Sequence, residues 1–274
     1  MTSSTGLLAG KKGLIMGVAN DRSLAWGIAR SVAQHGADLA FSYQGEALER
    51  RVRPLAASVN SDFLIPCDVT DDASLTALFD SIRERWGQLD FLVHGIAFSD
   101  KEQLKGRYAD TTRENFRRTM DISCFSFPDA ARRAAAMMPD GGSMVTLTYA
   151  GAERVIPHYN VMGVAKAALE ASVRYLAVDF GKRGIRVNAI STLAASGIGD
   201  FRHILKWNEF NAPLERNTTI DEVGGSALYL LSDLGQGVTG EVLHVDSGYH
   251  VVGMMNPRRA GDTAALLADF DDEA

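Results

Sequence analysis

Short apolar runs of strand type alternate with stretches of helical periodicity along almost the whole chain of 274 residues. Alternation of this kind builds βαβ units, which place their strands parallel in one sheet. We expect strands at Lys12–Met16, Asp38–Tyr43, Phe63–Pro66, Leu89–His94, Ser143–Thr148, Arg186–Ile190 and Glu241–Val245. We expect helices at about Ser23–His35, Glu46–Asn60, Asp72–Trp86, Thr112–Met138, Tyr159–Phe180 and Ile220–Leu231. The pattern predicts an α/β fold of Rossmann type, a doubly wound, seven-stranded parallel sheet with helices on both faces.

No repeat, linker or shift of composition divides the chain, so we expect one domain over residues 1–274. The chain carries 28 Lys and Arg against 34 Asp and Glu, a net charge of −6. Five of the acids lie in residues 262–274, an acidic tail without a base that we expect to be mobile. The remaining body is close to neutral and lacks the basic surface that nucleic-acid binding requires.

Several further classes are disfavoured. No apolar run approaches the roughly 18 residues of a membrane span, and the first residues lack the pattern of a secretory signal. Cys67 and Cys124 form neither a zinc-type spacing nor a disulfide framework, and we expect both to be small core residues. A cytoplasmic protein without a metal is the resulting expectation.

A dinucleotide site is predicted where the first strand turns into the first helix. Gly17 stands at the sharp turn, Ser23 is a plausible N-cap and Leu24 begins the helix. Free N–H groups and the dipole of a helix N-terminus favour phosphate. The segment is not a GxGxxG fingerprint, so on its own a plain strand–helix turn explains it equally well.

Polar residues at the ends of the neighbouring strands favour the dinucleotide. Asp68 and Val69 follow the third strand, where a carboxylate can accept a hydrogen bond from an adenine amine, and Ile96 follows the fourth strand. Ligands of open α/β sheets bind at these carboxyl ends. Gln44 replaces the usual ribose-binding acid after the second strand, and no Arg or Lys stands at that strand end to meet a 2′-phosphate. The residues therefore favour NADH over NADPH.

Tyr159 and Lys166 are seven residues apart, with Tyr149 ten residues before Tyr159. A separation of seven residues is about 20° short of two helical turns, which puts both side chains on one helix face, about 10 Å apart along the axis. No tyrosine of the chain has a lysine four residues later, so the usual Tyr-x-x-x-Lys arrangement of short-chain dehydrogenases is absent.

With this spacing the sequence, from about Gly10 to Met255, resembles the bacterial-type enoyl-acyl-carrier-protein reductases, a divergent branch of the short-chain dehydrogenases. The segments that carry the resemblance are Gly17-Val18-Ala19 with Ser23, Tyr43-Gln44, Cys67-Asp68-Val69, Leu147-Thr148-Tyr149, Pro157–Gly163, Ala165-Lys166-Ala167, Arg186–Ser191, Thr192–Ile198 and His244-Val245-Asp246. The resemblance implies that the protein reduces the trans-2 carbon–carbon double bond of enoyl-acyl-carrier-protein thioesters with NADH, in the elongation cycle of fatty-acid biosynthesis.

The resemblance also implies roles for individual residues. Tyr159 would donate a hydrogen bond to the developing enolate oxygen, Lys166 would hold the nicotinamide ribose, and Tyr149 would line the pocket. The implied cofactor contacts are Gly17, Ser23, Leu24, Gln44, Asp68, Val69, Ile96, Lys166, Thr192, Leu193 and Ala194. The implied substrate contacts are Ser99, Tyr149, Tyr159, Met162, Ile198 and Phe201, with residues 193–210 as a lid over the acyl chain.

Partners follow from the same resemblance. The acyl carrier protein is acidic, and Arg202 and Lys206 near the expected lid are candidates to receive it. The family is usually tetrameric, and the small residues Gly163, Ala167 and Ala171 would let helices of two subunits pack closely.

One departure from the family pattern stands after the sixth strand. The family continues there with Ala-Gly-Pro, an aliphatic residue and Arg, whereas Ser191 is followed directly by Thr192. Five extended residues span about 17 Å, and in the family this turn packs on the nicotinamide. Three explanations stay open: the five residues belong to a mobile loop that the given sequence omits, the deletion is real, or the lid reaches the cofactor by another path. A real deletion predicts weak NADH binding and loss of most turnover on an intact fold.

Two other functions stay open on the residues alone. One is a short-chain dehydrogenase acting on a ketone or alcohol, against which the missing Tyr-x-x-x-Lys counts. The other is a non-catalytic dinucleotide-binding protein, which only the five-residue gap supports.

Overall fold

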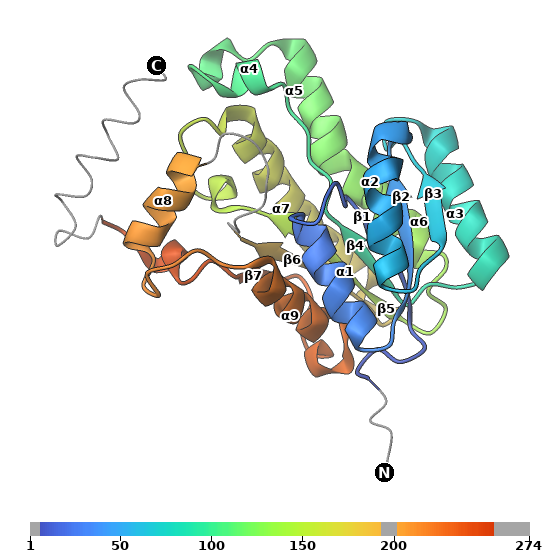
Figure 1. Ribbon diagram of the computed structural model, residues 1–274. Coiled ribbons are helices and arrows are strands. Elements are labelled where there is room, and N and C mark those ends of the chain that lie inside the picture. The colour runs from blue at the N-terminus through green and yellow to red at the C-terminus, as the bar shows by residue number, and fades with distance from the viewer. Residues whose placement is uncertain (1–5, 193–201, 255–274) are drawn as a thin grey trace.

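All seven strands of the computed structural model lie parallel in one sheet (Figure 1). The structure describes residues 6–192 and 202–254. The strand order is β3-β2-β1-β4-β5-β6-β7, and the chain reverses its direction of travel across the sheet between β3 and β4. The strands are β1 (Lys12–Met16), β2 (Asp38–Tyr43), β3 (Phe63–Pro66), β4 (Phe91–His94), β5 (Gly142–Thr148), β6 (Ile185–Ser191) and β7 (Val242–His244). The predicted Rossmann-type architecture is confirmed.

Helices cover both faces of the sheet, as a doubly wound fold requires (Figure 1). The longer helices are α1 (Leu24–Gln34), α2 (Gly45–Ser58), α3 (Asp72–Trp86), α5 (Arg113–Met120), α6 (Ser126–Ala135), α7 (Asn160–Gly181), α8 (Arg202–Asn211) and α9 (Ile220–Leu231). The short ones are α4 (Lys101–Leu104), η1 (Tyr108–Asp110), η3 (Ala150–Ala152), η4 (Asp233–Gly235) and η5 (Tyr249–Val251). No helix among the residues described combines the length and apolar character that crossing a membrane would need.

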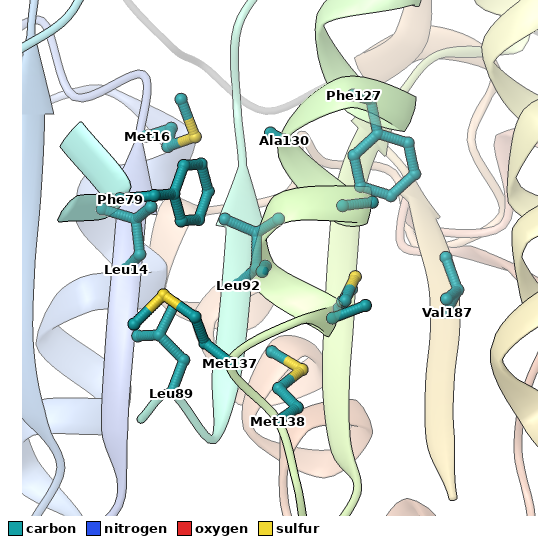
Figure 2. Packing of buried hydrophobic residues seen from close by; sticks show 14 of the residues in the cluster. Leu14, Met16, Phe79, Leu89, Leu92, Phe127, Ala130, Met137, Met138 and Val187 are labelled. Carbon is teal, nitrogen blue, oxygen red and sulfur yellow. The ribbon is translucent and has the colours of Figure 1, made fainter. Parts of the chain in front are cut away.

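Alternate residues of β1 serve the two faces of the sheet. Leu14 and Met16 pack with α3, α6 and α7, whereas Ile15 packs with α1, α2 and α9. Figure 2 shows the first cluster, with Leu14, Met16 and Leu92 of the sheet against Phe79 of α3 and Phe127 of α6. Strands buried on both sides read as continuous apolar runs, which explains why the sequence located them well.

The helix predicted over 112–138 is not continuous. It consists of α5, a π-helical turn (η2, Asp121–Phe125) and α6. The Ser123 hydroxyl of this turn donates to the Phe98 carbonyl at 2.9 Å, and the Ser126 hydroxyl, at the start of α6, donates to the Ile122 carbonyl of the turn at 2.6 Å. A π-turn re-aims side chains without ending the helix, and it often occurs at functional sites. Here it joins the helix to the loop after β4.

Candidate active site

Backbone meets backbone at the carboxyl edge of the sheet, where β1 and β4 end. Gly17 has a φ of +97°, and a Cβ placed on it would lie 2.2 Å from the Gly95 carbonyl oxygen. The Gly95 amide donates to the Met16 carbonyl at 2.9 Å. Only glycine fits this contact, so the predicted sharp turn at Gly17 is also a close approach of two loops.

Ser23 is the residue directly before α1, as predicted, but its side chain does not cap the helix. Its Oγ instead accepts hydrogen bonds from the Ala19 and Asn20 amides, both at 3.0 Å, and so closes the turn that precedes the helix. The first turn of α1 has neither a side-chain cap nor an acidic residue. A helix start of this kind suits an anion, which agrees with the phosphate site predicted here.

Gln44 and Asp68 meet across the ends of β2 and β3. The Gln44 Nε2 donates to the Asp68 Oδ2 at 2.8 Å. Hydrogen bonds from the Thr70 amide and hydroxyl, and then from Gln44, hold the pKa of Asp68 below its ordinary value. Val69 and Ile96 are half-buried against the core under this edge, and Leu24 packs on the other face of the sheet.

Tyr149, Tyr159 and Met162 form one buried cluster at the end of β5. The two tyrosine rings pack edge to face with their centroids 5.1 Å apart. Leu104, Ile156 and Ile204 pack against this cluster. Burial raises the pKa of both phenols, so both stay protonated at neutral pH.

Several features fix the ring of Tyr159, which lies directly before α7. A Cβ on Gly151 would lie 2.3 Å from the ring, so η3 packs flat against it. His158 and Asn160 on either side have φ values of 57° and 37°, a left-handed backbone that costs energy in residues other than glycine. The Asn160 Nδ2 donates to the Leu104 carbonyl at 3.0 Å. His158 itself is exposed.

Lys166 is buried, and its Nζ donates to the Leu147 carbonyl at 2.7 Å. Burial lowers the pKa of Lys166 to about 8. The structure therefore brings Tyr149, Tyr159 and Lys166 together at the end of β5. Tyr159 packs against Tyr149, which directly follows the strand, and Lys166 binds the carbonyl of Leu147 within it.

Ser99 lies in the loop after β4, where α5 holds its side chain. The Ser99 Oγ accepts from the Thr119 Oγ1 at 2.9 Å and from the Asn115 Nδ2 at 3.2 Å. Met162 lies beside the π-turn, with its sulfur 3.7 Å from the Ser123 Oγ. The π-turn thus links the loop of Ser99 with the tyrosine cluster.

The end of β6 is the least complete part of the predicted site. The Thr192 amide donates to the Thr148 carbonyl at 3.2 Å, and its buried Oγ1 has no hydrogen-bond partner among the residues that the structure describes. The predicted residues Leu193, Ala194, Ile198 and Phe201 lie outside the described residues, as do the Arg202 side chain, the first part of the lid and the acidic tail. Lys206 is exposed on α8.

Two buried polar groups beside the site were not predicted. Glu170 on α7 accepts a hydrogen bond from the Thr148 Oγ1 at 2.7 Å. His94 at the end of β4 has both ring nitrogens within hydrogen-bond distance of hydroxyls, Thr146 Oγ1 at 3.1 Å and Ser126 Oγ at 2.9 Å. Burial, with the Lys166 charge nearby, lowers the pKa of His94 to about 3. The sequence held one signal that could have indicated Glu170: it stands four residues after Lys166, on the same face of the helix.

The chain is similar to known proteins over most of its length. The family model described as enoyl-(acyl carrier protein) reductase matches residues 17–250. A Rhizobium meliloti protein named enoyl-[acyl-carrier-protein] reductase [NADH] 1 is 66% identical over 259 positions, covering 93% of this chain and 95% of that protein.

Solved structures agree in fold. The Anaplasma phagocytophilum reductase in complex with NAD has a TM-score of 0.88 and 59% identity, covering 92% of this chain and 98% of that one. The Bacillus cereus reductase with NADP+ and an indole naphthyridinone has a TM-score of 0.87 and 54% identity, covering 91% of this chain and 100% of that one. With the family model and these relatives in agreement, the chain belongs to the enoyl-(acyl carrier protein) reductase family.

Proposed function

We propose that this protein reduces the trans-2 double bond of enoyl-acyl-carrier-protein thioesters with NADH, in the elongation cycle of fatty-acid biosynthesis. The observation that carries the proposal is the protonated, buried phenol of Tyr159, which packs against Tyr149 at the end of β5 while Lys166 binds the same segment. A protonated phenol in this position can stabilise an oxyanion by donating a hydrogen bond to it.

The chain offers groups for each part of the cofactor. The start of α1, with Gly17, Ser23 and Leu24, suits the diphosphate, because it leaves first-turn amides without a side-chain acceptor. Gln44, Asp68, Val69 and Ile96 would border the adenosine. Lys166 and Thr192 would meet the nicotinamide ribose, since the Thr192 Oγ1 is buried without a partner. The resemblance to the family implies that Leu193 and Ala194, the next two residues, would also contact the cofactor.

In the reaction NADH, when bound, supplies the hydride that adds to the β-carbon of the enoyl thioester. The electron pair of the double bond then moves towards the thioester oxygen, giving an enolate. Tyr159 donates a hydrogen bond to that oxygen, and the positive charge of Lys166 favours the same negative charge. The enolate takes a proton at its α-carbon, which completes the saturated thioester.

The substrate would lie against the tyrosine cluster. Ser99, Tyr149, Met162, Ile198 and Phe201 are its proposed contacts, and residues 193–210 its lid. Lys206 on α8, with Arg202, would receive the acidic carrier protein by charge attraction.

We also propose a cytoplasmic homotetramer in which each chain acts as one catalytic domain. Large apolar side chains on α7 and η2 support subunit contacts, because Tyr175 is 76% exposed, Val178 79% and Phe125 58%. Gly163 and Ala167 on the same helix line a cavity of about 340 Å³ beside Tyr159.

A second candidate, a dinucleotide-binding protein without turnover, is favoured by one observation, the missing segment between Ser191 and Thr192. One experiment separates the candidates. NADH oxidation is measured with crotonyl thioester and with a panel of ketones, and NADH binding is measured separately by fluorescence. Oxidation with the thioester supports the proposal, oxidation with a ketone supports a ketone reductase, and binding without oxidation supports the second candidate.

The Tyr159→Phe variant tests the mechanism within the same assay. Removal of the hydroxyl removes the hydrogen bond to the enolate oxygen, and we expect kcat to fall roughly a hundredfold while NADH affinity changes less than about twofold. The Tyr229→Phe variant, exposed on α9, is the matched control and should keep full activity. A Tyr159→Phe variant as fast as the parent would refute the proposed role.

A further inference from the structure

Two side chains of α7, one helical turn apart, hold two consecutive residues of β5. The Lys166 Nζ donates to the Leu147 carbonyl at 2.7 Å, and the Glu170 carboxylate accepts from the Thr148 Oγ1 at 2.7 Å. Lys166 and Glu170 are therefore not paired with each other in the usual i,i+4 manner, although they lie on the same face of the helix. Both are buried, with 5% and 7% of their surface exposed.

Thr148 connects these hydrogen bonds between α7 and β5 to the candidate active site. Its side chain binds Glu170, its carbonyl accepts from the Thr192 amide at 3.2 Å, and the next residue is Tyr149. Thr148 also pairs with Ser191 in the register of β5 and β6. A shift of Thr148 would thus move the tyrosine cluster and the end of β6 together.

A buried carboxylate is costly to desolvate unless a nearby opposite charge and hydrogen bonds compensate it. Here its negative charge lies one turn from the buried Lys166 ammonium, in a region where water screens little. We propose that Glu170 is a positioning residue for the reduction: it fixes Thr148 between Tyr149 and Thr192, and its charge stabilises the Lys166 ammonium. This inference rests on the proposed function.

Groups on all sides of the pair set its electrostatics. Facing Glu170 are Thr148 of β5, Glu153 after η3, His244 of β7 and Arg174 of α7. Facing Lys166 are Cys124 of η2, His94 of β4 and Glu170. Burial lowers the pKa of Lys166, and Cys124 and Glu170 oppose it. Burial raises the pKa of both the Cys124 thiol and the Glu170 carboxyl, and the hydrogen bond from Thr148 opposes the rise at Glu170. Because a carboxyl is a far stronger acid than a thiol, Glu170 is the group that supplies the opposing charge.

The Glu170→Gln variant separates charge from shape, because the amide oxygen can still accept from Thr148. With the carboxylate gone, the pKa of Lys166 falls and the ammonium is lost at lower pH. We expect the midpoint of the Lys166 titration to move down by about one pH unit. The alkaline limb of kcat/KM should move by the same amount.

The Thr148→Val variant removes the hydrogen bond and keeps the carboxylate. We expect kcat to fall roughly fivefold at every pH, with the titration of Lys166 moved much less than in Glu170→Gln. Glu170→Asp keeps the charge on a shorter side chain and should behave like Thr148→Val. Glu84→Gln, on the exposed side of α3, makes the same change of charge far from the site and should match the parent.

The decisive readout does not need turnover. Protein labelled with ¹³C at the lysine ε-carbons is titrated by NMR, and the Lys166 signal is assigned by its loss in Lys166→Arg. A midpoint in Glu170→Gln equal to that in Glu84→Gln would overturn the inference. If Glu170→Gln does not fold, an unchanged kcat in Thr148→Val and Glu170→Asp overturns it. Absence of enoyl reduction in the parent would reject the proposed function, while the NMR titration still decides on the charge of Glu170.

Discussion

The two halves of the sheet build their parts of the site in different ways. In the half from β1 to β4, loop residues contact one another: Ser23 binds its own turn, and Gln44 binds Asp68 across two strand ends. In the half from β5 to β7, side chains of the helix α7 hold the strand β5. Lys166 donates to a strand carbonyl, and at the end of β6 the buried Thr192 Oγ1 has no hydrogen-bond partner among the described residues.

The contrast teaches where each half is sensitive to change. The first half is set by backbone that lies close together, and a single added methyl group is enough to disturb it. The second half is set by how α7 packs on β5 and by how the chain leaves β6, and this is where the residues expected after Ser191 are missing. We therefore expect an added side-chain atom to disrupt the first half of the site, and a change in the chain after β6 to disrupt the second half.

The largest effect is expected from Gly17→Ala. The new Cβ would lie 2.2 Å from the Gly95 carbonyl oxygen, on a backbone with a φ of +97°. We expect a loss of about 3 kcal/mol in the free energy of unfolding, measured by urea denaturation, and loss of NADH binding.

Gly10→Ala is the matched control for Gly17→Ala. Gly10 also has a left-handed φ, +74°, but a Cβ there meets nothing within 4 Å. Only the backbone strain applies, so we expect a loss of about 1 kcal/mol. Equal losses in both variants would show that the contact between the two loops does not hold this half of the site together.

Next in size is the effect of restoring the segment that the family has after Ser191. An Ala-Gly-Pro-Ile-Arg insertion between Ser191 and Thr192 should tighten NADH binding roughly a hundredfold, about 2.7 kcal/mol, and raise kcat with it. An insertion of five Gly and Ser residues has the same length without the turn and should give little gain. Fluorescence titration checks the affinity, after intact-mass measurement confirms the parent chain. A parent that already binds NADH as tightly as the restored variant would contradict the difference between the halves.

The sequence was a good guide to the sheet. β1, β2, β3, α3 and α9 begin and end where predicted, because apolar runs of buried strands and clear turn signals mark them. Thr219 and Glu222 form a capping box at the start of α9, a signal that is local in the chain. Contacts between residues far apart in the chain could not be predicted from such local signals.

The misses share one physical cause. The break between α5 and α6 reflects the bonds of Ser123 to the loop at Phe98, which periodicity along the helix does not contain. Glu170 contacts the site because α7 lies against Thr148 of β5. Ser23 does not cap α1, because its hydroxyl accepts a hydrogen bond from the Ala19 amide in the turn before the helix. The residue types of the tyrosine and lysine site could be predicted, whereas their partners depended on which strand and helix meet.

The smallest expected effect comes from Gln44→Ala, at the exposed edge of the first half. The variant loses the hydrogen bond from Gln44 to Asp68 but leaves the bonds from Thr70 to Asp68, so the loop should keep its shape. We expect NADH affinity to fall about threefold and the free energy of unfolding to stay within about 0.5 kcal/mol of the parent. Gln34→Ala, also exposed but towards the far end of α1, is the control and should leave the affinity unchanged. A hundredfold loss in Gln44→Ala would mean that this exposed side chain, rather than the close-packed backbone at Gly17, dominates recognition of the dinucleotide, and the first half would then be as dependent on single polar contacts as the second.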